Sequence, residues 1–77
     1  MGKYDPLYCY LKSDGRWQVE LSYTEIENIL SAILPNSAHK YTQWWDNNSH
    51  AQSKSWRDAG YVIKSVYLGE KVVFTKE

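Results

Sequence analysis

The residues best suited to chemistry lie in one stretch near the middle of the chain, from Trp44 to Trp56. Three of the four tryptophans and one of the two histidines fall within these thirteen positions. An indole ring can stack on a flat ligand such as a nucleobase while amide and imidazole groups hydrogen-bond to its edge. Tryptophan is also enriched in the hot spots of protein interfaces. The same rings can instead form the centre of a small core, and the sequence leaves both interpretations open.

Trp44 and Trp45 are adjacent, and adjacent side chains point in different directions on a helix or a strand. We therefore expect one of the two rings to be buried and the other to be at least partly exposed. The exposed ring, together with Asn47 and His50, forms a candidate recognition patch. Its ligand in this interpretation is a nucleobase or a protein partner.

The sequence contains no recognisable catalytic or metal-binding motif. His39 and His50 lie eleven residues apart, which matches no zinc-site spacing, and Cys9 has no histidine near it in the sequence. Glu25 and Glu27 are two residues apart and would point to different sides of a helix. The four glycines are scattered, so no phosphate-binding loop is present. We expect a non-catalytic protein with no cofactor and no bound metal.

The composition bounds the class of protein. A chain of 77 residues without a run of 18 apolar residues or a basic-then-apolar leader predicts one cytoplasmic domain, residues 1–77, with no membrane contact. The single cysteine excludes an internal disulfide. Nine basic and nine acidic side chains balance, which argues against a strongly electrostatic nucleic-acid binder. Residues 38–77 nevertheless carry six basic and four acidic groups.

The first half of the chain predicts two helices and one strand. Asp5-Pro6 is typical of a helix start, with Asp5 as the cap, and Ser13-Asp14-Gly15 ends that helix. Residues 16–22 alternate polar and apolar side chains, as a half-buried strand does. Ser22 and Glu25 then form a capping box for a helix. The apolar positions of this helix share one face, and we expect them to be buried: Ile26, Ile29, Leu30 and Ile33.

The second half predicts two further helical segments and a hairpin. Residues 37–45 form a short helical piece with Ala38 and Tyr41 facing inward. A helix over 49–59, capped by Asn48 or Ser49, closes at Gly60. Residues 61–75 form a hairpin that turns at 69–70.

The helix over 49–59 divides into two arcs when its residues are placed at about 100° intervals. The inward arc is expected to consist of Ala51, Gln52, Ser55, Trp56 and Ala59. The opposite arc is polar and basic and consists of His50, Ser53, Lys54 and Arg57. Side chains of these types contact phosphates and base edges in DNA complexes, although solvated residues on any amphipathic helix look the same.

The expected order of helix, strand, helix, helix, strand, strand is that of a winged helix, an α+β fold with a three-stranded antiparallel sheet. In that fold the helix before the hairpin is the recognition helix and the hairpin is the wing. The sequence therefore predicts a duplex-DNA-binding module that uses helix 49–59 and the hairpin. The alternative is an inhibitor that sequesters a nucleotide or a protein through Trp44, Trp45 and His50. The oligomeric state stays open, a homodimer included.

A resemblance to a known family rests on six short motifs. They are Lys3-Tyr4-Asp5-Pro6-Leu7-Tyr8, Leu34-Pro35-Asn36-Ser37-Ala38, Trp44-Trp45-Asp46-Asn47, Ser49-His50-Ala51-Gln52, Trp56 and Ala59-Gly60. From Lys3 to about Phe74 the chain resembles a family of short bacterial and phage domains of unknown function. The resemblance implies a prokaryotic or phage origin and a small stand-alone domain. It implies no activity, cofactor or catalytic residue.

Overall fold

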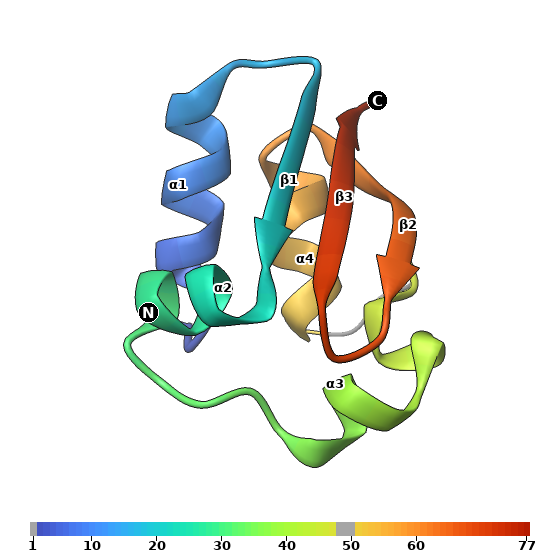
Figure 1. Ribbon diagram of the computed structural model, residues 1–77. Helices are drawn as coiled ribbons and strands as arrows, with labels where there is room; N and C mark the ends of the chain where they lie inside the picture. Colours follow the sequence, from blue (N-terminus) through green and yellow to red (C-terminus); the bar gives the residue numbers. More distant parts are fainter. Residues whose placement is uncertain (1, 48–50) are drawn as a thin grey trace.

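The computed structural model describes residues 2–47 and 51–77 (Figure 1). Over these residues it contains four α-helices, one 3₁₀ helix and three strands. In chain order they are α1 (Asp5–Asp14), β1 (Gln18–Ser22), α2 (Tyr23–Leu30), α3 (Asn36–Lys40), η1 (Thr42–Trp45), α4 (Ala51–Asp58), β2 (Tyr61–Tyr67) and β3 (Lys71–Lys76). The expected α+β class and order of elements are confirmed, and the helical piece expected over 37–45 is divided into α3 and η1.

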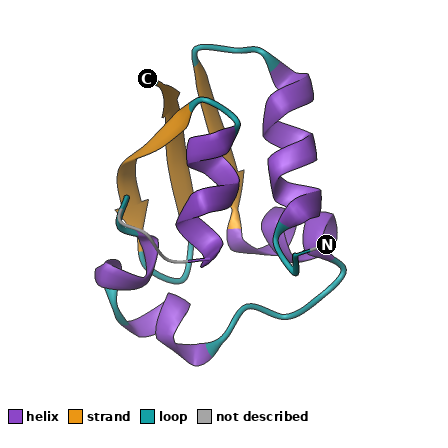
Figure 2. Ribbon diagram, turned by 180° about the vertical axis from the view of Figure 1, so that it is seen from behind, coloured by secondary structure: helices purple, strands orange, loops and turns teal. Residues whose placement is uncertain are grey.

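The three strands form one antiparallel sheet in the order β1-β3-β2, so the last strand in the sequence is the central one. Val19 pairs with Phe74 and Leu21 with Val72, and all four side chains are buried. Helix α4 lies behind the strands in Figure 1 and in front of them in Figure 2. The sheet therefore has one face covered by helix and one open face.

Local signals explain where α1 and α2 begin. The Ser22 Oγ accepts a hydrogen bond from the Glu25 amide and the Glu25 carboxylate accepts one from the Ser22 amide, each at 3.0 Å, so the predicted capping box is confirmed. Helix α1 begins one residue earlier than expected, because Tyr4 and not Asp5 is its N-cap. The Asp5 carboxylate instead accepts a hydrogen bond from the Gly2 amide at 2.8 Å.

The end of α2 differs from the expectation. The helix stops at Leu30, and Ser31 adopts a left-handed conformation with φ of 54°. The chain turns away there, so Ile33 is 83% exposed instead of buried, and Leu34 enters the core in its place. Ile29 is only half-buried. A second inward expectation also fails, since Tyr41 follows α3 in extended conformation and is 57% exposed.

Aromatic rings make up much of the core. The Trp45 and Trp56 rings stack with their centroids 5.9 Å apart, and Trp56 contacts Phe74 of β3 at 5.7 Å. The Trp45 indole N–H donates to the Ala38 carbonyl at 2.9 Å and lies 3.0 Å from the Tyr23 hydroxyl, which itself donates to that carbonyl. These contacts tie α2, α3, η1, α4 and β3 together.

Candidate functional site

The structure separates the two adjacent tryptophans, as expected. Trp45 is 1% exposed and therefore cannot contact a ligand, so its assignment to the recognition patch is wrong. Trp44 is half-buried, and its ring meets the edges of Tyr4 and Trp45 at centroid distances of 6.0 and 4.7 Å. Trp44 lines a shallow hollow of about 470 Å³ together with Tyr41, Gln43 and Gln52. The described part of the predicted patch is thus one partly accessible ring beside amide side chains.

Asn47 is a structural residue. Its Oδ1 accepts hydrogen bonds from the Trp56 indole N–H at 3.1 Å and from the Ile63 amide at 2.9 Å, and its Nδ2 lies 3.4 Å from the Ile63 carbonyl. The side-chain amide therefore pairs with β2 as a neighbouring strand would, and it also satisfies a buried indole. Both ends of the amide are engaged, so its expected role in ligand recognition is not supported by this geometry. Its partner at the patch, His50, lies outside the described residues.

The polar arc expected on α4 is partly wrong. Ser53 is 0% exposed, so it belongs to the core and not to a recognition face. Ala51, expected inward, is exposed. Lys54 and Arg57 are exposed as expected, one turn apart on α4. We call these two residues the α4 basic pair.

A groove that the sequence did not indicate separates the start of α1 from α4. Its volume is about 730 Å³. The charged, aromatic and thiol side chains that line it are Lys3, Tyr4, Asp5, Tyr8 and Cys9 on the α1 side and Lys54 and Asp58 on the α4 side. Burial raises the pKa of the Tyr4 phenol above its ordinary value. The spacing of Tyr4 and Tyr8, four residues apart at a helix start, could have indicated a shared aromatic face, but not which helix lies opposite.

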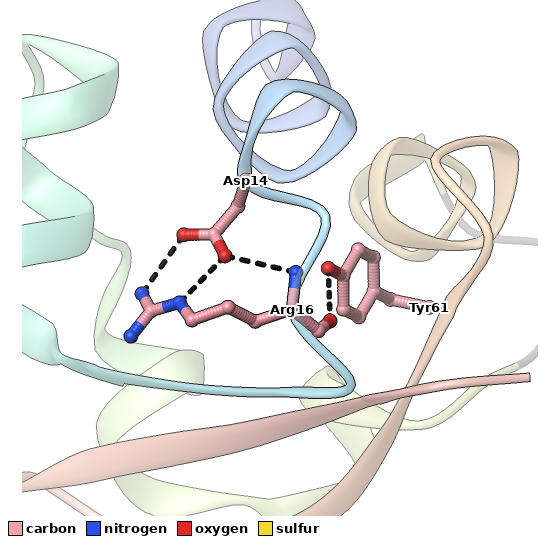
Figure 3. A network of polar contacts seen from close by, with 3 residues as sticks. All are labelled: Asp14, Arg16 and Tyr61. Carbon is pink, nitrogen blue, oxygen red and sulfur yellow. Dashed lines mark hydrogen bonds and ion pairs between the residues drawn. The ribbon is translucent and has the colours of Figure 1, made fainter.

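The opposite end of α1 carries a rigid turn (Figure 3). The Arg16 guanidinium donates to both Asp14 carboxylate oxygens, at 2.6 and 2.8 Å, and the Arg16 amide adds a third bond at 3.2 Å. The Arg16 hydrogen bond holds the pKa of Asp14 below its ordinary value. The Tyr61 side chain extends from β2, and its hydroxyl donates a hydrogen bond to the Arg16 carbonyl at 2.5 Å. The next residue, Trp17, is 75% exposed.

Over the described residues no three side chains among His, Cys, Asp and Glu are grouped so that they could hold a metal ion. No helix among them is long and apolar enough to span a membrane.

Over the described residues, the structure is that of a small α+β domain with a groove in which Tyr4 and Tyr8 lie near Lys54, and a shallow hollow beside Trp44. A family model described as Domain of unknown function (DUF7662) matches residues 4–77. The chain belongs to this family, which confirms the expected membership in a family of unknown function. A comparison with curated proteins found no match, and neither did one with solved structures.

Proposed function

We propose that this domain is a winged-helix-like module that binds duplex DNA through α4 and the β2–β3 hairpin. Three features of the fold support the proposal. Helix α4 directly precedes the hairpin, it packs on the sheet, and the strand order is β1-β3-β2. A recognition helix followed by a β wing has this arrangement in winged-helix proteins.

The α4 basic pair is the observation that carries the proposal. Over residues 2–47 and 51–77, Lys54 and Arg57 are exposed and form no salt bridge, so both cations are available to phosphates. Buried Trp56 anchors the inward side of the helix in the core. Because the helix is already folded, binding orders little additional backbone, which favours association.

The hairpin contributes fewer cations than its composition suggests. Lys71 is paired with Glu20 on the open sheet face at 3.0 Å, whereas Lys64 is exposed in β2. With Lys54, Arg57 and Lys64 as the phosphate contacts, the logarithm of the affinity should fall with the logarithm of the salt concentration with a slope of roughly 2 to 3.

One feature limits the analogy with helix-turn-helix proteins. Those proteins join their two central helices by a turn of about 3–4 residues. Here residues 31–50 separate α2 from α4, and α2 packs on α1 and β1 while α4 packs on α1 and β2. The supporting phosphate contacts are therefore assigned to the hairpin and not to α2.

Fluorescence anisotropy of a short labelled duplex at two salt concentrations tests the proposal. Lys54→Ala and Arg57→Ala should each weaken binding and lower the salt slope by about one unit. Lys12→Ala is the matched control, because Lys12 is an exposed lysine on a different helix, in the last turn of α1. Unchanged affinity in both α4 variants would exclude this face as the DNA site.

The hollow beside Trp44 supports a second candidate function, a bacterial or phage inhibitor that sequesters a nucleotide or a bacterial protein. Tyr41 offers an exposed ring there and Trp44 a half-buried one. The Gln52 amide is less available, since its Nε2 donates to the Trp44 carbonyl at 3.1 Å. This function predicts that Tyr41→Ala weakens binding of the sequestered nucleotide or protein, whereas Lys54→Ala and Arg57→Ala leave it unchanged.

A further inference from the structure

The groove between α1 and α4 has the properties of a ligand site that adjoins the proposed DNA face at Lys54. We propose that this groove holds one unstacked nucleotide, with its base on Tyr4 and Tyr8 and its phosphate at Lys54. If the nucleotide is part of a DNA strand, the inference rests on the proposed DNA binding. If it is a free nucleotide, the inference is independent of that proposal.

The size of the groove fits this ligand. Pockets for small molecules and cofactors have volumes of about 300–1,000 Å³. The groove, at about 730 Å³, lies within that range and is open on one side. It can therefore admit a nucleotide while the rest of a strand continues outside.

Two aromatic rings form the apolar part of the site. Tyr4 and Tyr8 are both half-buried, and both pack against the hydrophobic core. The Tyr4 ring is positioned by Trp44, and the Lys3 ammonium lies 5.8 Å from its centroid. Stacking on such rings tolerates any base, because every base has a π face.

The α4 side of the groove supplies one free cation and one free anion. Lys54 and Asp58 are exposed and one turn apart, yet over the described residues they form no salt bridge with each other. The ligand should therefore combine a flat apolar body, an anionic group for Lys54 and a hydrogen-bond donor for Asp58. A nucleotide of adenine, cytosine or guanine has all three, with an exocyclic amine as the donor. Thymine offers only its ring N3–H, so we expect Asp58 to favour a base with an exocyclic amine.

Lys54 connects the groove with the proposed DNA face. The same side chain belongs to the α4 basic pair and lines the groove. A nucleotide that leaves the base stack of the duplex next to α4 would therefore stay within reach of Lys54, which contacts the DNA backbone. Extrusion of a base costs least where the base is already unpaired, so a bulged nucleotide is the preferred strand ligand.

Cys9 provides a direct measure of occupancy. It is the only cysteine of the chain, it is exposed, and it lines the groove. The rate at which its thiol reacts with a disulfide reagent such as DTNB should fall when the groove is filled. The probes are AMP, a DNA hairpin with one bulged adenosine, and the same hairpin without the bulge.

The bulged hairpin should slow Cys9 modification roughly tenfold more than the fully paired one, as expected for a stacked base. Protection by AMP at least as strong as that by the bulged hairpin would assign the site to free nucleotides instead. Failure of AMP and of the bulged hairpin to protect Cys9 would overturn the groove proposal, even if duplex binding persists. Protection by AMP without any duplex binding would overturn the proposed DNA function and leave the groove site standing.

Variants separate the groove from the DNA face. Tyr8→Ala should weaken binding of the bulged hairpin roughly tenfold relative to the paired one, whereas Tyr10→Ala, on the same helix but outside the groove, should not. Because Tyr8 packs on the core, Asp58→Ala provides a second test at an exposed position. It should abolish the preference for a bulged adenosine over a bulged thymidine. Two results together would refute the site. In one, Tyr8→Ala weakens binding of the bulged and the fully paired DNA hairpins equally; in the other, Asp58→Ala leaves the preference for bulged adenosine over bulged thymidine unchanged.

Discussion

Substitution of Asn47 by alanine should destabilise the domain far more than its surface position suggests. The change leaves the indole N–H of Trp56, a side chain that is 0% exposed, without its acceptor. An unsatisfied buried donor costs about 1–3 kcal/mol. The lost bonds to the Ile63 amide and carbonyl add about 0.5–1 kcal/mol, because water can replace them at the exposed edge of β2. We expect a total loss of about 1.5–4 kcal/mol.

This loss is large for so small a protein. Domains are stabilised by roughly 0.05–0.15 kcal/mol per residue, which corresponds to about 4–12 kcal/mol here. At about 4–8 °C per kcal/mol, Asn47→Ala should accordingly lower the melting temperature by roughly 6–32 °C. It should also lower the guanidinium concentration at the midpoint of denaturation. Asn47→Asp keeps an acceptor for the indole and should cost less. Asn36→Ala is the control, since Asn36 is exposed and its side chain forms no hydrogen bond over the described residues. A loss below about 0.5 kcal/mol in Asn47→Ala would refute the structural role, since changes of that size are usual for surface positions without such contacts.

Three further predictions concern single positions. The pKa of Asp14 is lowered in the folded state by its pairing with Arg16. This pairing therefore stabilises the fold at pH values above the unfolded-state pKa of about 3.9, and the stabilisation is lost as the pH falls through the folded-state pKa. Asp14→Asn should therefore flatten the acid limb of a stability–pH curve; an unchanged limb would exclude this group as a source of acid sensitivity. Gly60→Ala should cost about 1–2 kcal/mol in chemical denaturation, because Gly60 has φ of 89° with open space around its Cβ position, and a neutral result would show that the turn relaxes. Ser53→Arg should unfold the domain, as measured by circular dichroism. A variant that stays folded would indicate that Ser53 lies on the exposed face of α4.

Features encoded by neighbouring residues could be predicted from the sequence. The capping box needs only Ser22 and Glu25, three positions apart, and the alternation around Val19 reflects the pleat of β1. The separation of Trp44 from Trp45 follows in the same way from the geometry of adjacent residues. Such signals depend on distances along the chain that the backbone itself fixes.

Features that depend on distant contacts could not be predicted. Placing α4 residues at equal angles gives their directions but not which directions other elements cover. Helix α4 packs on α1 and on β2, and Ser53 is buried although its angle on the helix had placed it with the exposed residues. Asn47 bonds to Ile63, sixteen residues further on, so nothing near it indicates a structural role. Ser31 ends α2 in a left-handed conformation that favours glycine, and the sequence carries no glycine there to mark it.

The position of β3 in the sheet has a consequence for how the chain folds. β3 is the only strand that pairs with both others, and it is also the last of the three to be synthesised. Before residues 71–76 leave the ribosome, β1 and β2 have no strand partner, and the inward side chains of β1 have nothing to pack against on β3. Pairing of residue 18 with residue 75 then closes a loop of most of the chain, which costs more entropy than local contacts do. Folding should therefore be all-or-none and late, because the sheet forms only when the six residues of β3 are in place.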